Sequence, residues 1–416
     1  MNKSQLQTLK GFRDFLPKKM SISNEAILRL RSVFERYGFQ ELQTPTLEYQ
    51  DVLLGKYGEE AEKLMYLFED QGKRKVGMKY DLTVPLARVV SSNPELQIPF
   101  KRYQIQPVWR ADNPQKGRYR EVYQCDVDTV GSNSPTADAE IIAVINDSLK
   151  ILGFPNFKIK VNSRKVLFSV MEKSKIDKKL WLSIIQSIDK LDKKSQEEVE
   201  KEMSDKNLTN IQIKDIFNNL SKAKPDDFLQ STIDITKSLG VNKNVIFEPT
   251  LSRGLDYYTG PIFESVVEAP KIGSITGGGR YDELLKTLGG PDLPAVGTTI
   301  GLDRVCDVVE ELNLWPNVRK SSSKVLVTVF TPELLEESIK VVTVLRQNEI
   351  NAELYLDQNT KLEKQIKYAD KKQIPYVIIL GQDEIKNNVV TLKSLQSKEQ
   401  KRVSMDEVCK LLCPVE

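Results

Sequence analysis

The amino-acid sequence predicts an α/β protein made of three regions. Strand-like and helical patterns alternate up to about Val161 and resume at about Val245. A polar stretch with helical spacing separates these two parts, and a regular β–α alternation follows the serine linker at residues 321–323. A chain of 416 residues is long enough for two or three domains, each with its own core.

The first region is predicted to begin with an amphipathic helix that Gly38 ends, because five apolar residues fall on one helical face: Ala26, Leu30, Val33, Phe34 and Tyr37. We expect strands over residues 39–44, 74–79, 101–110 and 121–130, and then an amphipathic helix over 137–152. Later in the chain, residues 260–267 are strand-like, and a glycine-rich turn at 277–279 is expected to lead into a helix near Asp282.

Residues 163–244 are rich in Lys, Asp, Ser and Glu and have helical spacing, so we interpret them as a helical insertion in a first domain over 1–322. The second domain is placed at 323–416. Its predicted strands cover 324–330, 352–356, 376–380 and 388–392, and its predicted helices cover 332–347, 361–372 and 405–412. Such alternation is typical of a compact α/β domain with a largely parallel sheet.

The composition indicates a soluble, reduced, cytoplasmic protein that does not enter a membrane. The chain has 61 basic and 58 acidic residues, a balance too mild to indicate nucleic-acid binding by charge alone. The first residues lack the apolar core of a signal peptide, and no apolar stretch is long enough to span a bilayer. The four cysteines form neither a metal-ligand array nor a disulfide framework.

The chain contains no histidine, which excludes several mechanisms. Ser-His-Asp and Cys-His catalysis, zinc held by imidazoles and an imidazole general base are all impossible. Any chemistry must therefore use arginine, lysine, carboxylates, hydroxyls or a metal bound through oxygen.

Two polar segments are compatible with ligand binding, but neither establishes it alone. In residues 108–121, Arg110 ends one predicted strand, and Arg118 and Arg120 share one face of the next, where arginines can bind phosphate oxygens. The alternative, a hairpin with surface arginines, is slightly favoured for this segment alone. In residues 296–305, a small-residue strand turns at Gly301 into a helix that carries Arg304. A packing role is favoured for that segment alone.

The segment 253–260, Arg-Gly-Leu-Asp-Tyr-Tyr-Thr-Gly, favours a functional interpretation. It places an arginine, an acid and two tyrosines between glycines, and a core strand does not need that composition. Such a polar cluster costs stability unless it serves a site. Pro261 follows it and removes one strand donor, so we expect a sheet edge or a bend there.

Taken together, these segments resemble the histidyl-tRNA synthetases, a class II aminoacyl-tRNA synthetase family. Residues 38–48 resemble class II motif 1, residues 110–124 motif 2 and residues 297–304 motif 3. The segments 79–85 and 253–260 resemble the two histidine-specific signatures, and residues 378–381 followed by Glu384 resemble the anticodon-binding domain. The resemblance implies a class II catalytic domain with an antiparallel sheet, the helical insertion, and a C-terminal α/β anticodon-binding domain.

The resemblance also implies roles for individual residues. The residues implied in histidine binding are Asp81, Thr83 and Gln124 for the amino group, Asp128, Tyr258 and Tyr281 for the imidazole, Tyr257 in the pocket wall, and Arg110 and Arg253. The residues implied in ATP binding are Arg110, Asp112, Arg118, Tyr119 and Arg304. Arg253 and Arg110 would be catalytic, with Arg253 between the histidine carboxylate and the α-phosphate, and Gln115 would face the acceptor end of the tRNA.

The implied function is the ATP-dependent joining of histidine to tRNA(His), with Mg²⁺ as a companion of ATP, no metal-binding residues assigned and a homodimer formed through motif 1. Two alternatives stay open. One is a non-catalytic, synthetase-like regulatory subunit that senses histidine, against which Arg110, Arg253 and Arg304 are all present. The other is a class II synthetase for a different amino acid, against which the Asp81–Thr83 segment and the Tyr257–Tyr258 pair argue.

Overall fold

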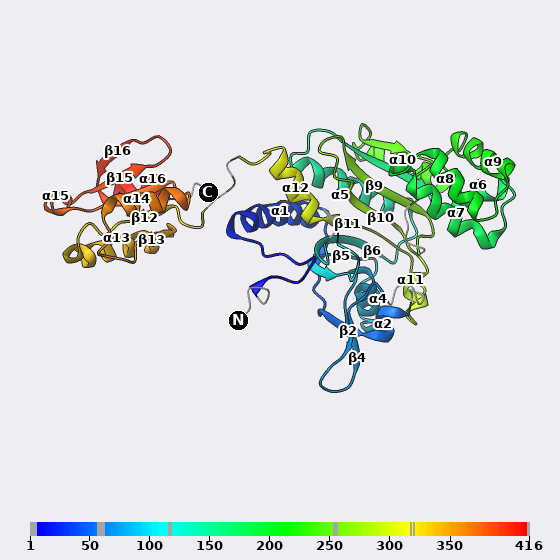
Figure 1. Ribbon diagram of the computed structural model, residues 1–416, viewed down its shortest axis with the longest axis horizontal. Coiled ribbons are helices and arrows are strands. Elements are labelled where there is room, and N and C mark those ends of the chain that lie inside the picture. Colours follow the sequence, from blue (N-terminus) through cyan, green and yellow to red (C-terminus); the bar gives the residue numbers. More distant parts are fainter. Residues whose placement is uncertain are drawn as a thin grey trace. The chain divides into compact units, whose positions relative to one another are not determined.

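The computed structural model describes residues 6–55, 63–114, 119–252, 257–316, 318 and 321–413 (Figure 1). Its internal contacts divide the chain into two compact units. One unit consists of Met1–Asp14 and Ser23–Trp315, and the other of Phe15–Ile22 and Pro316–Glu416. The domain boundaries 1–322 and 323–416 stay a prediction, and each unit is described by itself below.

The first unit is built on a sheet of eight strands, within the described residues, in the order β1-β5-β6-β11-β10-β9-β7-β8. These strands are β1 (Gln40–Glu41), β5 (Phe100–Trp109), β6 (Glu121–Val130), β11 (Ala295–Gly301), β10 (Ser274–Arg280), β9 (Pro261–Val267), β7 (Phe157–Ser163) and β8 (Val245–Phe247). Neighbouring strands from β5 to β7 are antiparallel, and β1 and β8 join the two edges in parallel. The predicted antiparallel sheet is confirmed.

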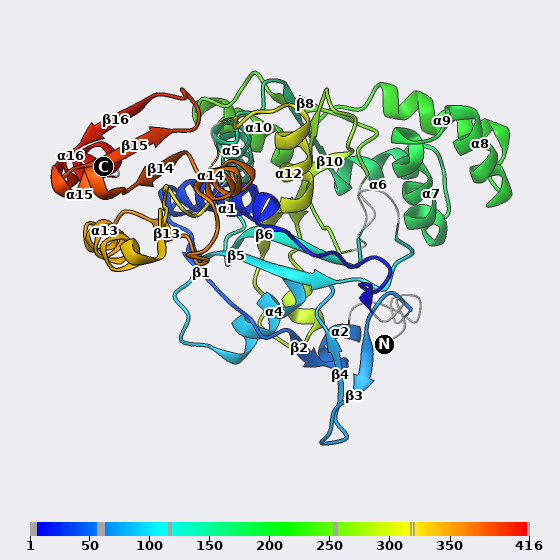
Figure 2. The ribbon, with the colours of Figure 1, turned by 60° about the vertical axis from the view of Figure 1, so that its left-hand side comes forward.

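Helices cover both faces of this sheet (Figures 1 and 2). Helices α5 (Pro135–Ile151) and α12 (Leu302–Glu311) pack on β6 and β11, and α4 (Thr83–Ser92) lies on the opposite side. Helix α5 begins two residues before the predicted start at residue 137, because the Ser134 side chain accepts a hydrogen bond from Thr136 N and Pro135 occupies the first turn. Helix α1 (Pro17–Arg36) ends just before Gly38, whose φ of +76° favours glycine.

The glycines at 277–279 correct a prediction: they lie within β10 and form no turn. Gly278 lies against Gly297 O and Thr298, and Gly279 lies against Pro261 O, the Tyr258 ring and Ile262. A Cβ at either position would meet these atoms, so the run of glycines serves close packing between neighbouring strands. The short helix α11 (Leu284–Thr287) follows.

The expectation of an edge or bend at Pro261 is wrong in its first part. Strand β9 is an interior strand between β10 and β7. Pro261 is its first residue, a position that proline tolerates in a strand.

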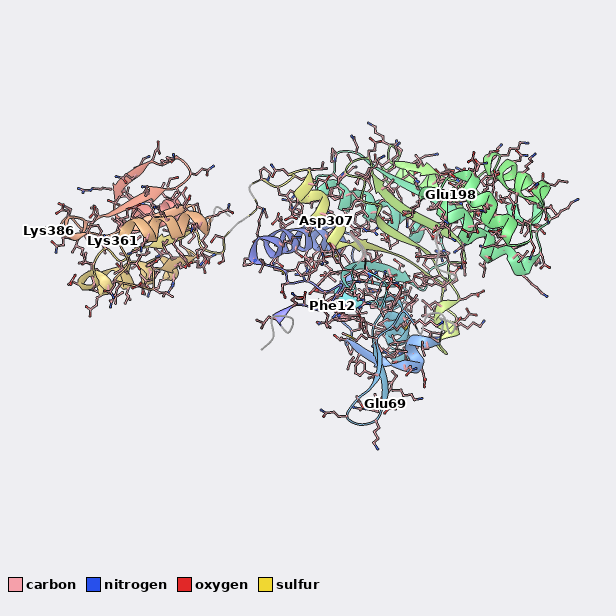
Figure 3. The ribbon with its side chains drawn as sticks, in the orientation of Figure 1. Phe12, Glu69, Glu198, Asp307, Lys361 and Lys386 are labelled. Carbon is pink, nitrogen blue, oxygen red and sulfur yellow. The ribbon has the colours of Figure 1, made fainter. Side chains whose placement is uncertain are left out.

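Two smaller groups of elements complete the first unit. A three-stranded sheet of β2 (Leu47–Tyr49), β4 (Lys75–Met78) and β3 (Leu67–Glu69) lies beside α2 (Gln50–Leu54), and Glu69 is close to the tip of its β3–β4 hairpin (Figure 3). The polar stretch is helical, as expected, with α6 (Arg164–Lys173), α7 (Trp181–Ile188), α8 (Gln196–Asp205), α9 (Asn210–Ser221) and α10 (Asp227–Ser238). Capping boxes begin two of these helices, one of them between Ser195 and Glu198 (Figure 3).

The second unit contains a five-stranded sheet in the order β13-β12-β14-β15-β16. The strands are β12 (Val325–Val327), β13 (Ala352–Leu354), β14 (Tyr376–Ile379), β15 (Val390–Ser394) and β16 (Gln400–Val403), and the helices are α13 (Leu335–Gln347), α14 (Leu362–Lys371), α15 (Gln382–Lys386) and α16 (Met405–Leu412). The expected largely parallel sheet is wrong for its second half, because β14, β15 and β16 pair antiparallel. The charged strand β16 carries no apolar signal, so its pairing was missed.

Candidate active site

Polar side chains and glycines share one face of the large sheet. Residues directly opposite each other on neighbouring strands project to the same face, and every second residue along a strand does so too. The register therefore aligns one row of Arg102, Asp128, Gly297 and Gly279, and a second row of Gln104, Asp126, Thr299 and Gly277. A third row holds Gln106, Gln124 and Gly301.

This polar face is the one that looks toward α4, because the alternate residues of β6 look the other way. Cys125 is fully buried, and burial together with nearby charges, among them Cys306 on α12, raises the pKa of its thiol. Helices α5 and α12 cover that apolar face, so the polar face is left for a ligand. The glycines of its rows, Gly277, Gly279, Gly297 and Gly301, are called the glycine floor below.

Asp128 lies at the centre of the first row and is 3% exposed. Its Oδ1 accepts a hydrogen bond from the hydroxyl of Tyr281, and its Oδ2 lies 2.8 Å from Nη2 of Arg102. Burial raises the pKa of the Asp128 carboxyl, and the Arg102 guanidinium opposes that rise. Oδ2 accepts no aligned hydrogen bond from any described residue, so it keeps an acceptor position for a bound group.

A second buried network joins Gln124, Thr299 and Asp126. The Thr299 hydroxyl donates to Oδ1 of Asp126 and accepts a hydrogen bond from Nε2 of Gln124 at 3.0 Å. The other end of that amide, Oε1 of Gln124, is buried and has no hydrogen-bond partner among the described residues. Burial raises the pKa of Asp126 to about 7, and Arg102 acts in the opposite direction.

Arg102 connects these carboxylates to the rest of the polar face. It is fully buried, its Nη2 donates to Leu82 O, and its Nη1 donates to Oε1 of Gln104 at 3.3 Å. Beyond Gln104, the amide of Gln106 receives hydrogen bonds from Gln104 and from Nζ of Lys79 at 2.7 Å. Burial lowers the pKa of Lys79 to about 8. A continuous series of hydrogen bonds and ion pairs from Lys79 to Arg102 thus holds the carboxylates of Asp126 and Asp128 in place.

Three tyrosines form the neighbouring wall. The rings of Tyr257 and Tyr258 are 4.6 Å apart, and those of Tyr257 and Tyr281 are 5.8 Å apart. Tyr258 is buried and lies over Gly279 of the floor. Burial, together with Asp128, raises the pKa of Tyr281 well above its usual value, so this phenol stays a hydrogen-bond donor.

The start of α4 brings two more predicted residues to this face. Oδ1 of Asp81 accepts a hydrogen bond from Val84 N at 2.9 Å, which holds the carboxylate at the first turn of α4, and Thr83 is the first residue of that helix. Both side chains are buried. The charge of Asp81 contributes to the raised pKa values of Asp126 and Asp128, which indicates that the three acids lie close together.

The predicted ATP residues are distributed over two parts of the site. Arg110 directly follows β5, with its guanidinium carbon 4.6 Å from the Tyr80 ring centroid and its Nε 3.3 Å from Tyr80 O. Asp112 is buried in the same loop. Arg304 lies on α12 and donates to the carbonyl oxygen of Ser274 at the start of β10.

Tyr119 belongs to the same loop and contacts the N-terminal segment. The guanidinium carbon of Arg13 lies 3.2 Å from the centroid of the Tyr119 ring, and Nη2 of Arg13 is 2.6 Å from Oδ1 of Asp303. Asp303 immediately precedes Arg304, so this stack connects the loop to α12.

The structure thus brings together seven of the predicted histidine-binding residues: Asp81, Thr83, Gln124, Asp128, Tyr257, Tyr258 and Tyr281. Arg110, also predicted to bind histidine, lies against Tyr80 after the end of β5. Arg253, Arg118 and Gln115 lie outside the described residues. Sequence reasoning missed Arg102, Asp126 and Thr299. The signal was the period-two run of polar residues in two otherwise apolar strands, 102–106 and 124–128.

Two features that the described residues lack concern metal binding and membranes. Those residues contain no group of three or more His, Cys, Asp or Glu side chains arranged to hold a metal ion. No helix among them combines the length and apolar character needed to cross a membrane.

Comparisons with known proteins agree over nearly the whole chain. The family pattern described as histidyl-tRNA synthetase matches residues 11–305, and the one described as anticodon binding domain matches residues 324–413. The histidine–tRNA ligase of Cytophaga hutchinsonii is 38% identical over 96% of this chain and 97% of its own length. That of Aeropyrum pernix is 40% identical over 96% of each chain. The crystal structure of histidyl-tRNA synthetase from Nostoc has a TM-score of 0.85 and 29% identity, covering 98% of both chains.

Proposed function

The chain belongs to the histidyl-tRNA synthetase family, and we propose that the polar face of its large sheet is the place where histidine is activated. As a member of this family, the chain is an ATP-dependent histidine–tRNA ligase, and full-length relatives with that activity do not favour the regulatory-subunit alternative. One observation carries the site proposal: buried Asp128 is held by Tyr281 and Arg102 beside a floor of glycines.

Asp128 is proposed to recognise the imidazole ring. The Tyr281 hydroxyl and the Arg102 guanidinium hold its carboxylate, and Oδ2 keeps acceptor capacity for a ring N–H. Tyr258 would contact the same ring from the wall, with Tyr257 behind it. A pocket built to hydrogen-bond a polar ring rejects apolar analogues by roughly 10⁴–10⁵, since its own buried groups would go unpaired.

The amino group of histidine is proposed to bind between Gln124, Asp81 and Thr83. An ammonium carries three donors and no acceptor, so it needs oxygen atoms around it. Oε1 of Gln124 is a buried oxygen without a partner among the described residues, and the Asp81 carboxylate adds a negative charge nearby. These groups would fix the substrate so that its carboxylate points toward the bound nucleotide.

The activation step is proposed to use arginines and no protein nucleophile. The histidine carboxylate attacks the α-phosphorus of ATP, a new O–P bond forms, and the bond to pyrophosphate breaks. Arg110 and Arg253 would stabilise the charge that builds on the phosphoryl oxygens, and Arg304 would bind the outer phosphates. Arg110 is suited to this role because Tyr80 holds its guanidinium through a hydrogen bond and ring contact.

The second step transfers the activated histidine to tRNA(His). A ribose hydroxyl at the tRNA end attacks the carbonyl carbon of the adenylate, and AMP leaves. The loop after β5 is proposed to serve both substrates: Asp112, Arg118 and Tyr119 would hold ATP, and Gln115 would face the acceptor end. The stack of Arg13 on Tyr119 supports a fixed position for the described part of this loop.

Mg²⁺ is proposed to accompany ATP. The described residues offer no ready-made cluster of metal ligands, which agrees with the preference of Mg²⁺ for phosphates, water and one or two carboxylates over an all-protein cage. Bound in this way, the ion would share the charge of the pyrophosphate group.

The second unit is proposed to bind the anticodon, in a domain over 323–416. A groove of about 680 Å³ lies between the ends of β12, β14, α15 and β16 and contains both signs of charge. Its lining includes Phe330, Gln400, Lys401, Arg402 and buried Glu384. Lys386 ends α15, the helix whose first residues line the groove (Figure 3). Aromatic, basic and hydrogen-bonding groups together suit an unpaired nucleotide of RNA, whose base can stack on an aromatic ring and form hydrogen bonds with polar side chains.

The chain is also proposed to act as a cytoplasmic homodimer. Strand β1 follows Gly38 in the motif 1 segment and forms an edge of the large sheet, where its outer backbone groups can pair with another chain. Leu47 and Tyr49 on β2, near the end of that segment, are exposed apolar residues. Light scattering of the purified protein measures the oligomeric state directly.

The amino acid specificity provides the test of the proposed function. ATP–pyrophosphate exchange is measured with each of the twenty amino acids, followed by charging of tRNA(His). Histidine alone should support exchange, and Asp128→Ala should abolish it. Exchange with threonine or proline, or normal exchange by Asp128→Ala, would refute the site.

A further inference from the structure

We propose that Thr299 and Asp126 are positioning residues that fix the orientation of the Gln124 amide, so that its oxygen faces the amino group of histidine. The inference rests on the proposed amino-group subsite and adds two residues that contact no substrate themselves. It explains why a half-buried threonine and a buried acid occupy the row next to the imidazole-binding row.

The argument begins with the hydroxyl of Thr299, which has one proton and oxygen lone pairs. Above its pKa of about 7, the Asp126 carboxyl is ionised and can only accept, so the short contact between Thr299 Oγ1 and Asp126 Oδ1 then uses the hydroxyl proton. The Thr299 oxygen can then only accept from its other neighbour. Gln124, 3.0 Å away, must therefore present its NH₂ group to Thr299.

This hydrogen-bond order determines the other end of the amide. With Nε2 held by Thr299, Oε1 of Gln124 is left buried, and no described residue donates to it. An unpaired buried oxygen costs stability unless a ligand satisfies it. The ammonium group of the substrate can donate to this oxygen and so removes the penalty. With the amide flipped, the NH₂ group of Gln124 would face the ammonium and repel it.

The network is held in place by the backbone. Asp126 and Thr299 are directly paired across β6 and β11, and Gln124 lies two residues away on the same face. Arg102 lies 3.9 Å from Oδ2 of Asp126 and favours the ionised, acceptor-only form of this acid. The position of Arg102 therefore favours donation from Thr299 to Asp126, on which the orientation of the Gln124 amide depends.

The test compares Thr299→Val with Thr299→Ser and with Thr298→Val. Valine keeps the shape of threonine and removes the hydroxyl, and serine keeps the hydroxyl. Thr298 is the neighbouring buried threonine on the opposite face of β11, so Thr298→Val is a matched control. Each variant is assayed by ATP–pyrophosphate exchange for its histidine KM and kcat. Inhibition by 3-(imidazol-4-yl)propionate, which lacks the amino group, is measured in parallel.

We expect Thr299→Val to raise the histidine KM by about 10- to 100-fold, the usual effect of losing a hydrogen bond to a charged group. The inhibition constant of the imidazolylpropionate and kcat should stay within about twofold. Thr299→Ser and Thr298→Val should behave like the unmodified enzyme. Asp126→Leu, which has a similar size and no acceptor, should raise the histidine KM in the same selective way and serves as the second variant if Thr299→Val does not fold.

Two results would overturn the proposed positioning role. The variant Gln124→Ala distinguishes them from a failure of the proposed amino-group subsite itself. If Thr299→Val weakens both ligands equally, the hydroxyl merely supports the pocket. If Gln124→Ala raises the histidine KM and neither Thr299→Val nor Asp126→Leu does so, the amide needs no positioning. Normal histidine KM in Gln124→Ala would instead show that the amino-group subsite itself is misplaced, which removes the premise of the inference.

Discussion

Asp128 and Gly297 face each other on adjacent strands, and the Asp128 carboxylate occupies the space that a side chain at position 297 would fill. A Cβ built on Gly297 would overlap the carboxyl group of Asp128 and also approach Val127 O. The acid that is proposed to recognise the substrate ring therefore depends on the absence of a side chain across the strand pair.

Gly297→Ala should consequently displace the Asp128 carboxylate from Tyr281 and Arg102. We expect kcat/KM for histidine to fall by at least about 100-fold, because a misplacement of about 1 Å in a preorganised site has this effect. Steady-state exchange kinetics measure it. Gly153→Ala is the control, since nothing lies near a Cβ there, and it should change stability alone. Unchanged histidine kinetics in Gly297→Ala would contradict the prediction.

Arg102→Met should destabilise the fold by about 3–5 kcal/mol, the typical cost of removing one partner of a buried ion pair. The reason is that Arg102 is fully buried and is the counter-charge of both Asp126 and Asp128. Urea unfolding followed by circular dichroism measures the change. Lys237→Ala, which removes an exposed ion pair with Asp234, is the matched control and should cost less than about 1 kcal/mol.

The stability of the first unit should depend on pH through Asp126. Its folded-state pKa is raised from 3.8 to about 7 by burial, with Asp128 and Asp81 raising it further and Arg102 and Thr299 lowering it. The folded state then binds more protons than the unfolded state between these two values. The resulting stabilisation is fully present below pH 3.8 and is lost as the pH rises to about 7.

Asp126→Asn lacks this titration, so the unmodified protein should gain stability relative to the variant as the pH falls from 8 to 5. The gain is at most about 1.4 kcal/mol per pH unit between the two pKa values. Urea unfolding at a series of pH values measures it. Asp234→Asn removes an exposed acid whose pKa is lowered, chiefly by a hydrogen bond from Gln230, and should not reproduce the gain.

Tyr281→Phe should lower kcat/KM for histidine by about 10- to 100-fold, because the Asp128 carboxylate loses the donor that orients it. The effect should appear with histidine and with the imidazolylpropionate alike, since both carry the ring. Isothermal titration of each ligand separates this result from a defect confined to the amino-group subsite. Tyr37→Phe also removes a hydroxyl bonded to an acid, Asp147, and should leave both affinities unchanged.

In the second unit, Arg402→Ala should raise the KM for tRNA(His) by about tenfold and leave ATP–pyrophosphate exchange intact, since Arg402 lines the proposed nucleotide groove. Arg346→Ala removes an exposed arginine from α13 of the same unit and is the control. Equal tRNA charging by the two variants would exclude the groove from tRNA binding.

Much of the fold could be predicted because its elements are marked locally. Strand β6 and helix α16 lie at the expected residues, and α5 differs by one or two at each end. The failures share a physical cause, which is dependence on contacts between distant segments. Gly277–Gly279 has the composition of a turn, and only the packing of Tyr258 and Gly297 against it explains its place in a strand.

The candidate site shows the same division. Asp128, Gln124 and the tyrosines could be predicted through resemblance to a known family, because their motifs are contiguous in sequence. Arg102 was missed, because the alternating polar residues 102–106 mark a polar face without showing that it is buried, and its partners Asp126 and Asp128 lie on another strand. Thr299 was missed because the role of its hydroxyl depends on Gln124 and Asp126, which lie on another strand.

The glycine floor has a further consequence for how this pocket can change. Glycine is the smallest residue, so every substitution at position 279 or 297 fills space and none creates it. A side chain at either position would displace Asp128 or Tyr258, which already lie against these glycines. Point substitutions at these two positions can therefore only disturb or narrow the pocket, and a broader substrate range would require changes among the side chains that surround the ring.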